Sequence, residues 1–162
     1  MSTRTATNPA PGYEDDFYAW TQDQAEKLRA RRHNEVDWNN VAEEIDSVGG
    51  SQKSEVRSRL LVLLQHLLKW QYQPEKRCHS WQSSISEQRI HIDGVLTASP
   101  SLKRLPEEAL DWAYERARRW ASDETGLPIA TFPQSCPYAA SDALNFGFMP
   151  GSPWHPDDLI RD

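Results

Sequence analysis

The chain has 162 residues, of which 24 are acidic and 18 are basic, so its formal net charge is −6. This length fits one domain with its own hydrophobic core. The negative balance argues against a nucleic-acid partner, because binding to phosphates needs a basic surface. Two cysteines are too few for a disulfide framework.

The first segment, residues 1–12, is rich in Thr, Ala, Asn and Pro, and we expect it to be disordered. It lacks the apolar stretch of a signal peptide. The longest apolar run in the chain is also too short to cross a bilayer. We therefore expect a cytoplasmic protein with reduced thiols and no membrane partner.

Two amphipathic helices are predicted before residue 50. The first runs from about Asp16 to Arg32, and Asp15 or Asp16 is its expected N-cap. The second runs from about residue 37 to residue 48, with Asp37 as N-cap, and we expect its apolar side chains to face the core. Gly49 and Gly50 are expected to end it. The apolar stripe of this second helix comprises Trp38, Val41, Ala42, Ile45 and Val48.

A central helix is predicted over residues 51–73, because apolar residues recur there with the 3.6-residue helical period. Its apolar arc covers roughly 200° of the circumference, so other elements must cover it from at least two sides. Ser51 is the expected N-cap, and Pro74 is expected to end the helix.

Two more helices are predicted, over residues 79–98 and 106–124, with Gly126 after the second. From residue 127 the chain is rich in Pro, Gly, Ser and aromatic residues, and one short helix is expected near residues 141–144. The predicted fold is all-α: an up-and-down bundle of four to five helices, with the Pro-rich irregular tail docked on it. We expect a division into residues 1–12, a bundle over 13–126 and a tail over 127–162.

Several motifs resemble one known family. They are Asp16-Phe-Tyr-Ala-Trp-Thr-Gln, Asp37-Trp-x-Asn-x-Ala-Glu-Glu-Ile, His66-Leu-Leu-Lys-Trp-Gln-Tyr-Gln-Pro-Glu, Ser80-Trp, Glu87-Gln-Arg and Glu124-Thr-Gly-Leu. Together they are similar to the bacterial "domain of unknown function 29" family over about residues 13–150. The resemblance implies an all-helical domain and supplies no catalytic residues.

Other searches for chemistry favour structural interpretations. The run from Gly49 to Ser54 lacks the spacing of a phosphate-binding loop, and we interpret it as a turn between helices. The Glu-x-x-His pairs of a di-metal bundle are missing. Cys78 beside His79 could serve a zinc site or a thiol nucleophile, but an ordinary cysteine near a helix start is favoured. We predict no metal, no cofactor and no catalytic residue.

Polar and aromatic residues at the edges of the apolar stripes give two competing hypotheses. In the favoured one, the polar groups form a buried network that fixes helix register, with Glu44 and Arg89 as an ion pair. In the other, they line a polar cleft between helices two, three and four. The residues concerned are Glu44, His66, Gln71, Gln88, Arg89, Trp38, Trp70 and Trp81.

The preferred functional hypothesis is a non-enzymatic helical binding or scaffolding module that acts through protein–protein contacts. Seven tryptophans support it, because Trp is enriched at interface hot spots. The partner is an unknown protein, and a homodimer is one form that the contact could take. The alternative is a small-ligand binder or an enzyme that uses the polar cleft.

Overall fold

The computed structural model describes residues 10–161. These residues form α-helices and short 3-10 turns, and the only β-type pairing among them is one bridge between Cys78 and Ile160. The predicted all-α class is confirmed. Of the segment predicted to be disordered, residues 1–9 lie outside the described part of the chain. No helix within residues 10–161 combines the length and hydropathy needed to cross a bilayer.

The chain divides into two compact units, with the boundary between Gly50 and Ser51. We call residues 10–50 the N-terminal unit and residues 51–161 the C-terminal unit. The division predicted from the sequence, into residues 1–12, 13–126 and 127–162, stays a prediction.

The N-terminal unit contains α1 (Phe17–Arg29), a 3-10 turn (His33–Glu35) and the first turns of α2 (Trp38–Tyr72). The Asp16 side chain accepts a hydrogen bond from the backbone N–H of Ala19 at 2.9 Å, so the predicted N-cap of α1 is confirmed. Asp37 acts in the same way at the start of α2, because it accepts from the backbone N–H of Asn40.

The predicted break at Gly49 and Gly50 is wrong, because α2 runs through both glycines without interruption for 35 residues. Glycine weakens a helix interior by about 1 kcal/mol relative to alanine, which does not by itself end a helix. Helix termination at glycine uses a left-handed backbone, and among the described glycines only Gly126 and Gly151 have positive φ. Ser51 is therefore an interior residue of α2 and not an N-cap.

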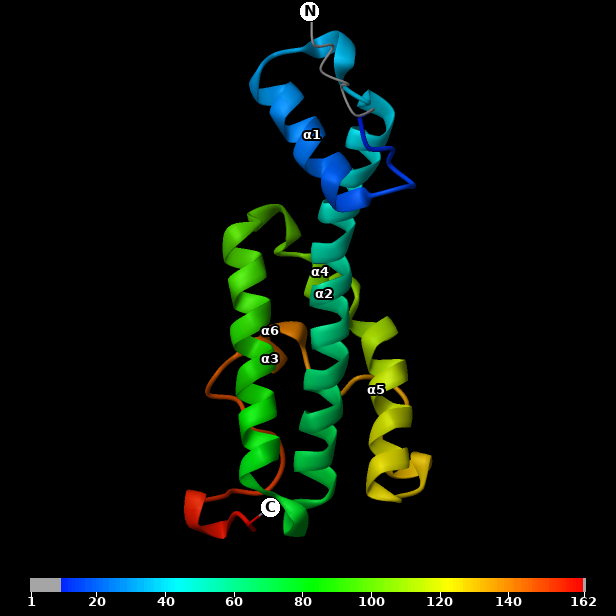
Figure 1. The fold of residues 1–162 in the computed structure, drawn as a ribbon. Coiled ribbons are helices and arrows are strands. Elements are labelled where there is room, and N and C mark those ends of the chain that lie inside the picture. The colour runs from blue at the N-terminus through cyan, green and yellow to red at the C-terminus, as the bar shows by residue number, and fades with distance from the viewer. Residues whose placement is uncertain (1–9, 162) are drawn as a thin grey trace, which may run out of the picture. The chain divides into compact units, whose positions relative to one another are not determined.

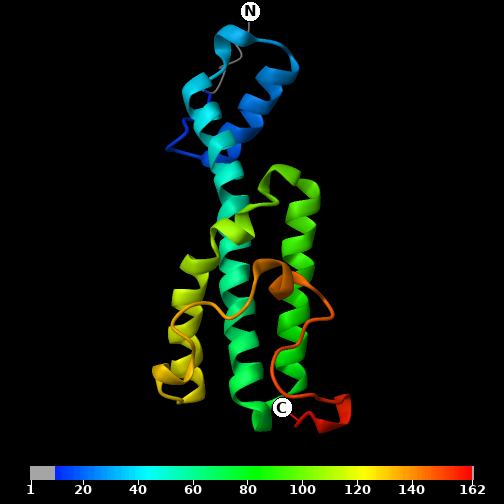
Figure 2. The same cartoon turned by 180° about the vertical axis from the view of Figure 1, so that it is seen from behind.

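In the C-terminal unit, the second part of α2 lies beside α3 (His79–Ala98) and α5 (Leu110–Thr125), as Figures 1 and 2 show. The predicted bounds of α3 are confirmed. The helix predicted over residues 106–124 is instead divided at Ala109 into α4 (Leu105–Glu108) and α5. Gly126 ends α5 with φ of 70°, as its position predicted.

The core of the C-terminal unit is centred on α2, where the side chains of Leu60, Leu63, Leu64, Leu67 and Leu68 are fully buried. The segment after α5 contributes to this core through Phe132 and Tyr138. Figure 2 shows this segment crossing α2 on its way to α6 (Ala140–Leu144). Short 3-10 turns complete the unit at Pro74–Lys76, Pro100–Leu102, Ile129–Thr131 and Pro156–Asp158.

The tryptophans differ in burial more than the helical stripes suggested. Trp20 and Trp70 are buried, and Trp81, Trp112 and Trp154 are half-buried, the last three against the core. Trp38, which was predicted to face the core, is exposed, and so is Trp120.

Candidate functional site

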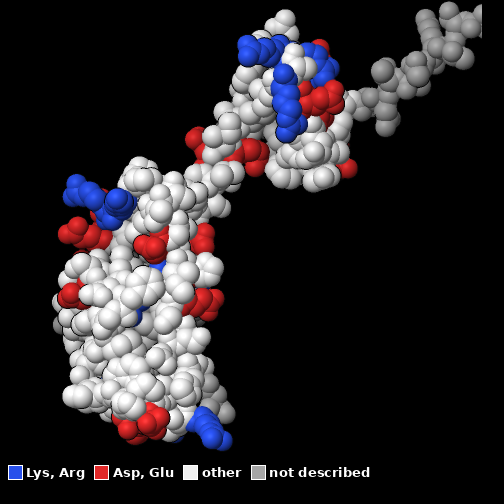
Figure 3. All heavy atoms as spheres, turned by 90° about the vertical axis from the view of Figure 1, so that its left-hand side faces the viewer, with Lys and Arg blue, Asp and Glu red and all other residues white. Residues whose placement is uncertain are grey.

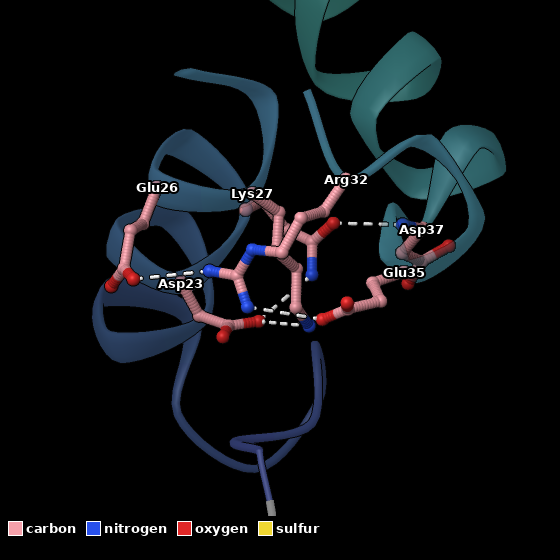
Figure 4. A network of polar contacts seen from close by, with 7 residues as sticks. Asp23, Glu26, Lys27, Arg32, Glu35 and Asp37 are labelled. Carbon is pink, nitrogen blue, oxygen red and sulfur yellow. Dashed lines mark hydrogen bonds and ion pairs between the residues drawn. The ribbon is translucent and has the colours of Figure 1, made fainter. Parts of the chain in front are cut away.

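In the N-terminal unit, α1, the 3-10 turn and the first turns of α2 form a helical hairpin. Polar contacts from α1 hold this hairpin together, as Figure 4 shows. Asp23 accepts hydrogen bonds from Lys27 at 2.6 Å and from Gln24 at 3.0 Å. The side-chain oxygen of the buried Gln24 in turn accepts from the backbone N–H of Asp37 at 2.7 Å. Gln24 thus ties α1 to the residue that caps α2.

Arg32 holds the connection between the two helices. Its guanidinium contacts Glu26 on α1 at 3.0 Å and Glu35 in the 3-10 turn at 3.1 Å (Figure 4). All three side chains are well exposed, so each ion pair contributes at most about 1 kcal/mol. Their joint effect is to fix the turn that leads into α2.

The other end of the hairpin is closed by aromatic contacts. Tyr13 packs edge-on against Phe17 and Trp20, with ring centroids 5.7 Å and 4.9 Å away. The Tyr13 hydroxyl donates to the Glu44 carboxylate at 2.5 Å, and this hydrogen bond raises the pKa of Tyr13 to about 12. The hairpin therefore has its own small aromatic core and polar clasps at both ends.

Despite these contacts, the apolar side chains of α2 in this unit remain uncovered. Trp38, Ile45 and Val48 expose 52%, 68% and 66% of their surface, and Val41 between them is half-buried. Their spacing of three, four and three residues places them within an arc of about 80° on one side of the helix. We call these four residues the exposed stripe. The prediction that this stripe faces the core is wrong.

The same helix provides the comparison. Farther along α2, a second apolar series with similar spacing is fully buried, at Val56, Leu60, Leu63, Leu67 and Trp70. That series is covered by α3, α5 and the chain after α5, residues 126–161, which we call the C-terminal segment. The exposed stripe has the pattern of a helix that packs against another helix, but no described element covers it.

One end of the exposed stripe has a fixed geometry. The indole N–H of Trp38 donates to the backbone carbonyl of His33 at 3.0 Å, and the two rings stack with centroids 6.2 Å apart. Because the indole is held in this way, less side-chain entropy is lost when a partner covers it.

Arg89 is the most buried of the polar residues that the sequence singled out, with 2% of its surface exposed. Its guanidinium donates to the backbone carbonyls of Ala143 at 2.8 Å, Phe148 at 2.7 Å and Phe146 at 3.5 Å. Burial lowers its pKa to about 10. The predicted ion pair with Glu44 is wrong, because Arg89 bonds these carbonyls and Glu44 bonds Tyr13.

Arg77 has a matching role that the sequence analysis missed. It is buried and donates to the carbonyls of Trp70 at 2.8 Å, Ser152 at 3.0 Å and Pro150 at 3.5 Å. Backbone carbonyls leave no residue-specific signal in a sequence, so neither arginine's partners could be read from residue types. Together the two arginines fasten the C-terminal segment to α2 and α3.

Gln71 and Gln88 also have partners within the C-terminal unit. Gln71 accepts a hydrogen bond from the hydroxyl of Tyr138 at 2.7 Å, and Gln88 accepts from Arg59 at 3.2 Å. Gln88 lines a shallow groove of about 390 Å³ together with Glu55, Ser58, Arg59 and Val62. Neither contact joins two of the polar residues that were predicted to satisfy one another.

His66 and Trp81 lie near an ion pair that was not anticipated. Lys69 contacts Glu124 at 2.6 Å, and its ammonium stands 4.5 Å from the centre of the Trp81 ring. Burial raises the pKa of Glu124, but hydrogen bonds and charge from Lys69, with the nearby Gln65 amide, lower it overall. The Gln65 amide nitrogen is buried without a well-aligned hydrogen bond among the described residues.

The imidazole of His66 is half-buried and bonds the backbone carbonyl of Val62 at 2.9 Å. Burial lowers the pKa of His66, so the ring is neutral near pH 7. Trp70, the last of the candidates, is fully buried and packs edge-on against Trp154 at 5.0 Å. The eight candidates thus form separate local contacts: Trp38 and Glu44 in the N-terminal unit, and the other six in the C-terminal unit.

Across residues 10–161, no group of three or more His, Cys, Asp or Glu side chains is arranged to hold a metal ion. Glu87 and His91, four residues apart on α3, form an exposed contact at 3.9 Å.

Comparison with known protein families identifies a match over most of the chain. The family model described as "Domain of unknown function DUF29" covers residues 13–149. This range agrees with the resemblance seen in the sequence motifs, which was placed at about residues 13–150. Comparisons with curated proteins and with solved structures found no match.

Proposed function

The chain belongs to the family described as domain of unknown function DUF29, and we propose that it is a protein-binding module that docks its partner on the exposed stripe. The observation that carries this proposal is the contrast within α2. One apolar series of this helix is fully buried, whereas the other exposes between half and two thirds of Trp38, Ile45 and Val48. Exposed apolar residues that form a contiguous patch are typical of interaction surfaces.

The energetics support a docking role. Full burial of a side chain such as Ile or Val contributes about 1.5–3 kcal/mol, and Trp is the residue most enriched at interface hot spots. The N-terminal unit also has a rigid frame, because Gln24, Arg32 and Tyr13 fix the hairpin independently of a partner. A preformed surface loses less conformational entropy on association.

The alternative, a small-ligand or catalytic site in a polar cleft, has less support. Arg89, Gln71 and Gln88 are each hydrogen-bonded to other groups of the protein, which favours a structural role for them. A cytoplasmic location and a protein rather than a nucleic-acid partner remain part of the proposal, and the net charge of −6 favours the latter.

The test is affinity capture from the source cells with three forms of the protein. The first variant disrupts the exposed stripe with the double change Ile45→Glu and Val48→Glu. The matched control is Ile90→Glu on α3, whose side chain is 60% exposed. We expect the wild type and the control to retain the same proteins and the double variant to lose them.

All three forms should melt at similar temperatures, because the substituted side chains are exposed. Equal retention of bound proteins by the double variant and the control would contradict the assignment of the docking surface.

A further inference from the structure

The charge of this protein is distributed unequally between the two units. Residues 10–50 contain ten Asp and Glu against four Lys and Arg, whereas residues 51–161 contain thirteen of each. The net charge of −6 over the described residues therefore lies in the N-terminal unit, and the C-terminal unit is neutral. A field of one sign concentrated on a small unit selects partners of the opposite sign.

Within the N-terminal unit, two of the four basic side chains are already neutralised. Lys27 pairs with Asp23, and Arg32 pairs with both Glu26 and Glu35. These pairs lie on α1 and the turn, so they do not offset the acidic charge farther along α2.

The helix that carries the exposed stripe begins without a basic residue, and its acidic residues lie just before it and after its first turn. From residue 34 to residue 52 there is no Lys or Arg, and the acidic residues there are Glu35, Asp37, Glu43, Glu44 and Asp46. Figure 3 shows one face of the molecule, on which one group of acidic side chains has no basic side chain among it. At 100° per residue, Asp37 and Glu44 lie within about 40° of one edge of the exposed stripe. Asp46 is exposed and lies about 80° beyond the other edge, whereas Glu43 is on the opposite side of the helix. The exposed stripe is thus bordered by acidic residues on both sides.

We propose that the occupant of the exposed stripe is a basic amphipathic helix of a partner protein. This inference rests on the proposed function and adds the chemistry of the partner. A helix that lies along an apolar strip presents its own apolar anchors at intervals of three and four residues. The residues beside those anchors then face the acidic surroundings of α2, where Lys and Arg are favourable and Asp and Glu are repelled.

The charge also argues against a second copy as the occupant. Two copies that paired through this stripe would bring together two units of net charge −6, and like charges at an interface are unfavourable. One side of the stripe further suits a close helical neighbour. Ala42 is exposed, and a Cβ added at Gly49 would meet no atom within 4 Å.

The experiment uses the full chain and two synthetic peptides of roughly 21 residues, each with Leu at the a and d positions of a heptad repeat. One peptide has Lys at the flanking positions and the other has Glu. Binding is measured by fluorescence anisotropy of a dye on the peptide. We expect the Lys peptide to bind at least about tenfold more tightly than the Glu peptide.

Two single variants separate local charge from net charge. Asp46→Lys, beside the exposed stripe, should weaken binding of the Lys peptide by about fivefold or more and strengthen binding of the Glu peptide. The matched control, Glu107→Lys, makes the same charge change on an exposed residue of α4 and should leave both affinities within about twofold.

The outcomes distinguish this inference from the proposed function. Equal binding of the two peptides, abolished by Ile45→Glu with Val48→Glu, would overturn the basic occupant and leave the docking surface standing. Failure of both peptides to bind, with a dimeric chain that the same double change makes monomeric, would make the occupant a second copy. If the double change Ile45→Glu and Val48→Glu left the affinity for the peptides unchanged, both proposals would be overturned.

Discussion

Arg89→Met is expected to destabilise the fold by releasing the C-terminal segment from α3. The arginine makes two short hydrogen bonds, at 2.8 Å to Ala143 and 2.7 Å to Phe148, and a longer one at 3.5 Å to Phe146. A hydrogen bond to a charged group contributes about 1.5–3 kcal/mol, so the two short bonds together contribute roughly 3–6 kcal/mol. Removal of a buried cation relieves part of this, because its desolvation is unfavourable.

The expected loss is therefore about 3–5 kcal/mol, which corresponds to a fall in melting temperature of about 6–20 °C for a chain of this size. The assay is urea unfolding followed by circular dichroism. Hydrogen exchange measured by mass spectrometry should also become faster in the variant than in the wild type over residues 143–148, with a smaller increase over α3. Arg116→Met is the control, because Arg116 is exposed and its contacts among the described residues, with the carbonyl and the ring of Trp112, stay within its own helix.

A loss below about 1 kcal/mol for Arg89→Met would refute this reasoning, because it would mean that the burial of the charge cancels its hydrogen bonds. Unchanged exchange over residues 143–148 would refute it in a second way, since the segment would then be held by other contacts.

Three further predictions concern stability. Leu64→Ala should lower the free energy of unfolding by about 2–5 kcal/mol in urea titrations, because Leu64 is fully buried in α2. The folded state lowers the pKa values of Glu124 and His66, so it binds fewer protons than the unfolded state does. The melting temperature should therefore decrease as the pH is lowered, first below the ordinary pKa of 6.5 of His66 and again below the ordinary pKa of 4.5 of Glu124. Glu124→Gln should remove the lower step and His66→Gln the upper one. In thermal melts, Gly126→Ala should destabilise because φ is 70°, whereas Gly94→Ala in mid-helix should stabilise by about 0.5–1 kcal/mol.

Local signals in the sequence predicted much of the fold because they act over a few residues. The bounds of α3, the N-cap at Asp16 and the left-handed glycine at Gly126 each follow from backbone chemistry close by. The end of a helix predicted at Gly49 and Gly50 was wrong because it also rested on a local signal alone. Glycine permits a helix to end but does not require it, and the continuity of α2 is decided by the rest of the fold.

Contacts between distant segments were predicted poorly. Glu44 and Arg89 were matched by charge, yet one bonds a tyrosine hydroxyl and the other bonds three backbone carbonyls. The helical stripe at Ile45 and Val48 was read as core, because periodicity reports that a face is apolar and not what covers it. That difference between pattern and burial is what makes the exposed stripe visible as a candidate interface.

The most direct test of the docking surface is site-specific photo-cross-linking in the source cells. Benzoylphenylalanine is placed at position 45 in the exposed stripe and, in a separate variant, at the equally exposed position 90 on α3. The account predicts a discrete protein adduct from position 45 and none from position 90. No adduct from position 45, or the same adducts from both positions, would contradict it.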